Sequence, residues 1–242
     1  MKYALIVGIN YTGTPNQLMG CVNDAQNMRQ QLIDHHGYPE DNITMITDHT
    51  ETRPTAHNIL TTLQSFSYQK DMTEFFFHYS GHGASIGDRV IDEDDERDEA
   101  LVAIDSLIRD DDIKAIFDKI KCPVYCLFDC CHSGTALDLN YQYQFMSHKW
   151  TSESAVNTSP CKVFMVSGCL DRQTSADAYI GGVFQGAMTH AYLETMKRYH
   201  HRPTLLQLVL GMRHTLKKGK YKQLPQLNCS VRADIKELWL KP

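Results

Sequence analysis

The chain has 242 residues, a length that allows one α/β domain with a full hydrophobic core. Its formal net charge of -5 comes from 24 basic and 29 acidic residues without a run of lysine or arginine, so we expect neither nucleic acid nor an anionic membrane as a partner. The first apolar run, residues 4–9, is too short for the core of a signal peptide or for a membrane span, so we expect a cytoplasmic protein.

The first eighty residues alternate between apolar runs and helical patterns. The first run has no alternation of polar and apolar residues, as expected for a strand that is buried on both faces of a parallel sheet. Asn23 or Asp24 is placed to cap the first helix, and Gly37 is placed to end it. Together the patterns predict a βαβαβ unit with strands at residues 3–9, 43–47 and 74–79 and helices at residues 24–36 and 55–66.

An acidic run over residues 92–99 interrupts this alternation, since seven of its eight side chains are carboxylates. It separates two short apolar segments, residues 89–91 and 100–104, so we expect an exposed hairpin or an excursion from the sheet edge. Residues 110–112 are three further aspartates, and they precede a helical pattern. Negative charge at the start of a helix is favoured by the helix dipole.

The last hundred residues return to the strand and helix patterns. A strand is predicted at residues 123–128 and another at 162–167, with helices near 183–198 and 204–218. The polar segment 140–160 has no pattern and is predicted to be a long loop. The fold class is therefore α/β, with an open, mostly parallel sheet, helices on both faces and right-handed crossovers.

Two short glycine-flanked segments each follow a predicted strand, His78-Tyr-Ser-Gly-His82-Gly and Asp129-Cys-Cys131-His-Ser-Gly. Since the carboxyl ends of parallel strands gather at one edge of a sheet, a histidine and a cysteine are expected together there. A thiol is mostly protonated at neutral pH, so a nearby imidazole that accepts its proton makes it a nucleophile. His82 and Cys131 are the candidate base and nucleophile, and the backbone N–H groups of Gly83 and Cys131 are candidate oxyanion donors.

Both segments resemble the motifs of the metacaspase branch of the caspase-like cysteine peptidases. Residues 20–25 and 167–178 also resemble family segments, so the similarity extends over most of the chain. The resemblance implies that the cysteine directly before His-Ser-Gly attacks, which selects Cys131 over Cys130. It also implies a monomer and a caspase-like sandwich over one domain, residues 1–242, with a large-subunit-like part at about 1–139, a connecting loop at about 140–160 and a small-subunit-like part at about 161–242.

The resemblance further implies an acidic substrate pocket made by Cys21, Asp24, Ser80 and Asp129. Two carboxylates in a partly buried pocket are unfavourable when the pocket is empty, and a basic side chain would offset that with charge-assisted hydrogen bonds. We therefore expect protein or peptide substrates that are cleaved after Arg or Lys. The alternatives are that Asp24 is only a helix N-cap and that Asp129 only orients a nearby loop.

Calcium is the one cofactor that the resemblance implies. The implied ligands are carboxylates on both sides of the nucleophile in the chain, namely Asp98, Asp110, Asp111 and Asp138. A solvated acidic loop and a dipole-favoured helix start would explain the same residues without a metal. Many family members also cleave themselves at a basic residue, for which Lys149 is the candidate here, although a surface lysine in a loop needs no function.

Two other functions stay open. The chain could be a catalytically silent caspase-like module that binds peptides or scaffolds partners, since fold does not guarantee chemistry. A zinc-binding hydrolase site is less expected, because CxxC spacing is absent; its candidate ligands are His78, His82, Cys130, Cys131 and His132. A dinucleotide cofactor is not expected, because the pattern G-x-G-x-x-G is missing.

Overall fold

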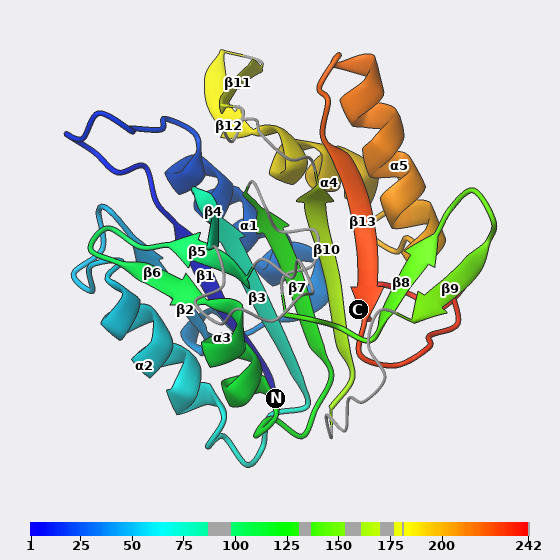
Figure 1. Ribbon diagram of the computed structural model, residues 1–242, viewed down its shortest axis with the longest axis horizontal. Helices are drawn as coiled ribbons and strands as arrows, with labels where there is room; N and C mark the ends of the chain where they lie inside the picture. The colour runs from blue at the N-terminus through cyan, green and yellow to red at the C-terminus, as the bar shows by residue number, and fades with distance from the viewer. Residues whose placement is uncertain (87–97, 131–136, 153–160, 170–176, 181, 242) are drawn as a thin grey trace.

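The computed structural model describes residues 1–86, 98–130, 137–152, 161–169, 177–180 and 182–241. Within these residues the centre of the molecule is a sheet of eight strands in the order β2-β1-β3-β7-β10-β13-β8-β9 (Figure 1). The strands are β2 (Ile43–Thr47), β1 (Lys2–Gly8), β3 (Glu74–Ser80), β7 (Val124–Asp129), β10 (Val163–Cys169), β13 (Leu224–Cys229), β8 (Tyr141–Gln144) and β9 (Lys149–Ser152). The first five are parallel and the last three are antiparallel, which confirms the predicted mostly parallel sheet.

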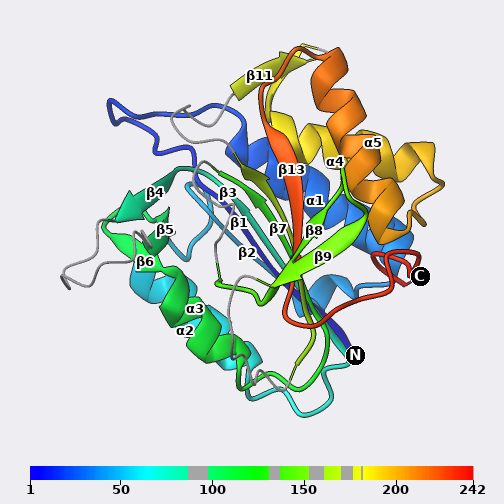
Figure 2. The same cartoon turned by 45° about the vertical axis from the view of Figure 1, so that its right-hand side comes forward.

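Helices cover both faces of this sheet, as predicted. One face carries α1 (Cys21–His36), α4 (Ala187–Arg198) and α5 (Leu205–Lys218), and the other carries α2 (Ala56–Phe66) and α3 (Asp110–Phe117). Figure 2 shows the sheet between these two groups of helices. Each face buries its own apolar cluster. We call the cluster beneath α2 and α3 the first cluster, and the one beneath α1, α4 and α5 the second cluster.

Two smaller sheets and one short helix complete the described fold. They contain β4 (Gly83–Ile86), β5 (Asp98–Val102) and β6 (Leu107–Arg109), β11 (Asp177–Ile180) and β12 (Val183–Gly186), and the 3-10 helix η1 (Glu40–Asn42). Since β4 and β5 are antiparallel, the expected hairpin around the acidic run is present. Its first strand starts earlier in the chain than predicted, and residues 89–91 lie outside the described residues.

The register of the parallel strands places three strand ends at one sheet edge. Gly8 pairs with Ser80, and Ser80 pairs with Asp129, so β1, β3 and β7 end side by side. The Gly81 amide then donates a hydrogen bond to the Asp129 carbonyl over 3.2 Å, which ties the two motif segments together at the ends of β3 and β7. The edge at which a histidine and a cysteine were expected is therefore the point where both segments leave the sheet.

The prediction of a loop over residues 140–160 is wrong, because residues 141–152 form the hairpin of β8 and β9. Tyrosine and glutamine alternate along β8, and this period of two is typical of a half-buried strand. The Tyr143 ring lies 4.9 Å from that of Phe145 and 5.2 Å from that of Trp150, centroid to centroid. The Trp150 indole N–H donates to the Ala233 carbonyl over 3.1 Å, which anchors the hairpin to the C-terminal segment.

Two helix starts also differ from the prediction. The first helix begins at Cys21, with Gly20 as its N-cap, so neither Asn23 nor Asp24 caps it. The helix predicted near 183–198 begins only at Ala187, because the four preceding residues form β12. A Gly-Gly pair before β12, with Gly182 at φ +92°, is the turn signal that separates β11 from β12.

The cysteines confirm the expectation of buried thiols rather than a disulfide framework within the described residues. These buried thiols are Cys21, Cys122, Cys126, Cys130, Cys161 and Cys229. Burial raises the pKa of Cys122 to about 12 and holds the pKa of Cys126 and of Cys229 well above the usual range of a thiol. Among the described helices, none combines the length and apolar composition that crossing a bilayer requires.

Replacing Trp150 by Ala should lower the free energy of unfolding by about 1–3 kcal/mol, because a half-buried ring and its hydrogen bond to Ala233 are lost. Urea unfolding measures this change. The control is Lys149→Ala at the exposed position beside it, which should stay within about 0.5 kcal/mol of the native chain. An equal effect of the two substitutions would contradict the anchoring role of Trp150.

Candidate functional site

His82 lies two residues beyond the end of β3, between β3 and β4. Its ring nitrogen Nε2 is 2.7 Å from the backbone oxygen of Asn16. A carbonyl oxygen only accepts, so the hydrogen of a neutral imidazole must be on Nε2, and Nδ1 is the nitrogen that can take up a proton. The ring of Tyr11 lies 4.6 Å from the imidazole, centroid to centroid, and supports it from one side.

Two tyrosine hydroxyls hold the backbone of His82. The His82 N–H donates to the Tyr11 hydroxyl over 2.8 Å, and the Tyr79 hydroxyl donates to the His82 carbonyl over 2.7 Å. The Tyr11 hydroxyl in turn donates to the Val102 carbonyl over 2.6 Å. A Cβ atom on Gly81 would stand 2.7 Å from the hydroxyl of Tyr79 and 2.9 Å from that of Tyr11, so this position of the motif has no room for a side chain.

Tyr11 and Asn16 were not identified from the sequence. Both lie between β1 and α1, about seventy residues before the histidine that they contact, and Tyr11 has an unusual positive φ of 51°. One signal was available. A tyrosine shortly after the end of a central parallel strand is expected at the same sheet edge as the ends of the neighbouring strands.

The candidate nucleophile lies outside the described residues, together with His132 and the rest of residues 131–136. The preceding residue, Cys130, is buried in the first cluster. Of the two candidate oxyanion donors, Gly83 is the first residue of β4, directly after His82. Of the expected base and nucleophile, the described residues therefore include only His82, whose contact through Nε2 leaves Nδ1 available to accept a proton.

Asp24 and Asp129 are completely buried at the same sheet edge. They lie beside the N-terminus of α4, on the face of the sheet that carries α1 and α4. The Gly186 N–H donates to Asp24 Oδ1 and Oδ2 over 3.0 and 2.9 Å, and the Thr189 N–H donates to Asp129 Oδ2 over 2.8 Å. A Cβ on Gly186 would stand 2.2 Å from Asp129 Oδ2 and 2.6 Å from Asp24 Oδ2, so both carboxylates pack closely against this glycine. We call these two residues the carboxylate pair.

The other two predicted pocket residues are placed differently. The Ser80 hydroxyl donates to Asp24 Oδ2 over 2.7 Å, so Ser80 contacts the carboxylate pair directly. Cys21, at the start of α1, is buried in the first cluster instead. The alternative that Asp24 is a helix N-cap is wrong, because Asp24 caps no helix of its own. Asp129 accepts the N–H of Thr189 and so holds the first turn of α4.

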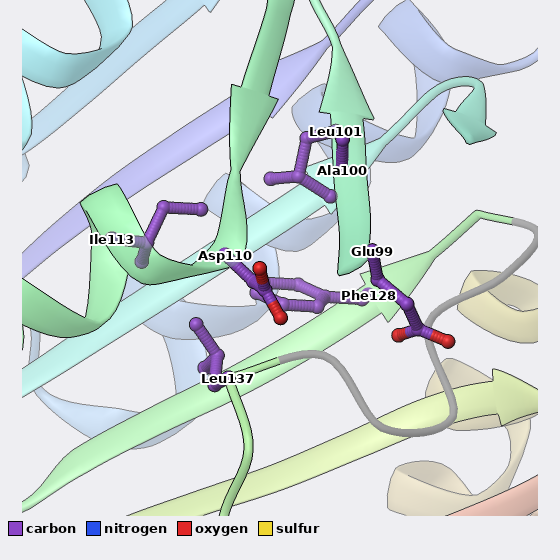
Figure 3. A pocket seen from close by; sticks show the side chains of 7 residues that line it. All are labelled: Glu99, Ala100, Leu101, Asp110, Ile113, Phe128 and Leu137. Atoms are coloured by element: carbon purple, nitrogen blue, oxygen red, sulfur yellow. The ribbon is translucent and has the colours of Figure 1, made fainter. Parts of the chain in front are cut away.

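The acidic residues that were expected to bind calcium come from segments around one cavity of about 10 Å³, which has room for about one water molecule. Figure 3 shows that Asp110, at the start of α3, and Glu99, on β5, both line it. Asp98 and Asp138 each adjoin a lining residue, Glu99 or Leu137. Glu99 was missed from the sequence, where the acidic run offered too many equivalent carboxylates.

The three expected ligands whose side chains are described, Asp110, Asp111 and Asp138, do not come together as a metal site. Asp110 Oδ1 accepts the N–H of Asp111, while the exposed Asp138 carboxylate lies 3.7 Å from Lys114 Nζ. The side chain of Asp98 is outside the described part. Among the described side chains, no group of three or more His, Cys, Asp or Glu could hold a metal ion.

The possible zinc ligands that are described and the possible self-cleavage residue are also placed apart from one another. His78 and Cys130, two of the possible zinc ligands, lie on opposite faces of the sheet, because His78 contacts α4 and Cys130 packs in the first cluster. Lys149 is the exposed first residue of β9 and pairs with Gln144, so it lies in a hairpin rather than in the expected loop.

Comparison with known proteins is consistent with the motifs. Residues 1–236 match a family model described as Caspase domain. The chain is 35% identical to Metacaspase-1 of Debaryomyces hansenii, 34% to that of Yarrowia lipolytica and 36% to that of Meyerozyma guilliermondii, each over 97% of the chain. It spans 66%, 62% and 70% of those relatives, so about a third of their length has no counterpart in it.

Two solved structures share the fold. Protein GSU0716 from Geobacter sulfurreducens has a TM-score of 0.71 and 22% identity, and the match covers 100% of this chain and 97% of that one. The structure of pro-sf-caspase-1 has a TM-score of 0.62 and 13% identity, with coverage of 98% and 88%. These likenesses confirm the predicted caspase-like sandwich.

Replacing Tyr11 by Phe should accelerate hydrogen exchange of the His82 amide by about tenfold or more, because that N–H loses its acceptor. Exchange followed by NMR at this amide measures the effect. Tyr68→Phe is the matched control, since the Tyr68 side chain is 71% exposed, and it should leave the exchange unchanged. An unaltered rate in Tyr11→Phe would show that the hydroxyl does not hold this backbone.

Proposed function

The chain belongs to the caspase-domain family, in its metacaspase branch, and from this we propose that it is a cysteine endopeptidase that hydrolyses peptide bonds after arginine or lysine. The observation that carries the proposal is the pairing of Ser80 with Asp129, because it brings the two motif segments together at one sheet edge. His82 follows the first of these residues by two positions and Cys131 follows the second by two positions. We propose that the enzyme acts on protein or peptide substrates as a monomer, as the resemblance implies.

In the proposed reaction, the Cys131 thiol passes its proton to Nδ1 of His82, and the thiolate attacks the carbonyl carbon of the substrate. The N–H groups of Gly83 and Cys131 stabilise the negative charge that develops on the carbonyl oxygen. The imidazolium then gives its proton to the leaving amine. A water molecule, deprotonated by His82, hydrolyses the thioester and restores the thiol. The contact of Nε2 with Asn16 supports this assignment, because it leaves Nδ1 as the base.

Selection of a basic residue is assigned to the carboxylate pair, with Ser80 holding Asp24 and with Cys21 as the remaining predicted pocket residue. Both carboxylates are removed from water, so a cation that reaches them gains a stronger interaction than it would at the surface. A planar guanidinium offers five N–H donors and is weakly hydrated, and both properties favour entry into such a site.

Calcium activation is proposed on the resemblance, with Asp98, Asp110, Asp111 and Asp138 as ligands. Its support is the convergence of their segments on the cavity that Asp110 and Glu99 line. The described side chains do not fit the ion as they stand, because the Asp138 carboxylate is paired with Lys114. No step of the reaction is therefore assigned to calcium.

Self-cleavage at Lys149 is likewise a proposal, and it requires the strand pairing between Lys149 and Gln144 to open.

A panel of fluorogenic peptides with Arg, Lys, Asp or citrulline at P1 tests the proposed activity. We expect cleavage after Arg and Lys, and a kcat/KM roughly 100-fold lower for citrulline, because this neutral analogue cannot pair with the carboxylates.

Cys131→Ala should abolish hydrolysis, whereas Cys130→Ala should keep it. Full activity of Cys131→Ala would refute the dyad, and equal rates in chelator and in millimolar calcium would refute calcium activation.

Asp129→Asn should lower kcat/KM for the Arg peptide by about 30-fold or more while leaving citrulline cleavage nearly unchanged, because the amide keeps an acceptor for Thr189 N–H but loses the charge. The ratio of the two kcat/KM values measures the effect. Asp34→Asn, at an exposed position of α1, is the control and should preserve the ratio. An unchanged ratio in Asp129→Asn would exclude this pocket.

A further inference from the structure

His78 is a second histidine of the first motif, and it has no part in the proposed reaction. Its side chain is completely buried. Alternate residues of a strand point to the same face, so His78 lies with Ser80 on the face of β3 that α1 and α4 cover. The two residues stand beside the carboxylate pair, and Ser80 contacts it directly through Asp24.

His78 reaches the second carboxylate through one intermediate residue. Its Nε2 atom lies 3.2 Å from the hydroxyl oxygen of Thr189, which is also completely buried. The N–H of the same threonine donates to Asp129 Oδ2 over 2.8 Å. One face of β3 therefore supports both carboxylates, Asp24 through Ser80 and Asp129 through His78 and the first turn of α4.

The direction of the hydrogen bond between His78 and Thr189 follows from the other ring nitrogen. Nδ1 of His78 is buried and has no hydrogen-bond partner among the described residues. A buried N–H without an acceptor is more unfavourable than a buried lone pair without a donor. The hydrogen is therefore assigned to Nε2, which donates to the Thr189 hydroxyl.

The charge of His78 suits a pocket that receives a cation. Burial lowers the pKa of His78 to about 3, so the ring is neutral at neutral pH. A charged imidazolium here would pair with the carboxylates itself and would repel a basic substrate side chain. A neutral histidine supplies a hydrogen bond to Thr189 without that repulsion.

We propose that His78 and Thr189 are positioning residues of the basic-residue pocket. The His78 ring fixes the first turn of α4 through the Thr189 hydroxyl, and that turn holds the Asp129 carboxylate in the orientation that receives the substrate cation. This inference rests on the proposed cleavage after Arg or Lys, and it adds two residues that determine how well the site recognises that side chain.

Thr189→Val tests the inference, because it removes the hydroxyl and keeps the volume. We expect KM for the P1-Arg peptide to rise about tenfold while kcat changes less than about threefold. Thr195→Val is the matched control. Thr195 is an equally buried threonine of α4 whose hydroxyl donates to Ala191 in its own helix, and its replacement should leave KM unchanged.

Conservative replacements separate the effect of the lost hydrogen bond from the effect of a changed side-chain volume. Thr189→Ser retains the hydroxyl, so its KM should stay close to that of the native chain and well below that of Thr189→Val. His78→Gln presents an amide N–H near the position of Nε2 and should likewise retain a lower KM than His78→Leu, which has no donor. Equal KM values for the Gln and Leu replacements would overturn the role of the His78 hydrogen bond.

Hydrogen exchange of the amides of residues 186–190 gives a readout that does not depend on activity. Thr189→Val should accelerate it and Thr195→Val should not. Unchanged exchange, or a loss confined to kcat, would overturn the inference alone. If the native chain cleaves citrulline as well as arginine peptides, the proposed function fails, and the inference about its pocket fails with it.

Discussion

The burial of two carboxyl groups at the N-terminus of α4 is the constraint on which the rest of the sheet edge depends. Taking a carboxylate out of water costs several kcal/mol, unless donors replace the lost hydration. Here the donors are the N–H groups of Gly186 and Thr189 and the hydroxyl of Ser80, and they meet Asp24 and Asp129. These residues come from α1, β3, β7 and the junction of β12 with α4, so all of these elements must be in place before both carboxyl groups have these donors.

Because side chains alternate along a strand, the residues that contact His82 and those that contact Asp24 lie on opposite faces of the sheet. Tyr79 and Ser80 are consecutive in β3 and therefore point to opposite sides. Tyr79 contacts Tyr11 and the backbone of His82, whereas Ser80 contacts Asp24. The support of the base and the support of the carboxylate pair are thus separate sets of side chains joined by one peptide bond. A substitution in one set is therefore expected to leave the side chains of the other set in place.

Local signals predicted the elements of this fold, and long-range contacts decided the details that were missed. Gly37 ends the first helix with φ +65°, as its position indicated, because a left-handed C-cap is a local property. Asp24 looked like a cap because its side chain suits that role, but the N–H that it accepts is that of Gly186, 162 positions away. The motifs predicted His82 from its neighbours, whereas Asn16 contributes only a backbone carbonyl, which any residue type could supply.

The burial of the cysteines has a consequence for chemical labelling of the chain. Six thiols are enclosed by the two apolar clusters or the strand ends beside them, and burial holds Cys122, Cys126 and Cys229 in their protonated form. An electrophile that reacts with thiolates is therefore excluded from these positions by packing as well as by protonation. Labelling of these six thiols is then set by the fraction of the sample that is unfolded.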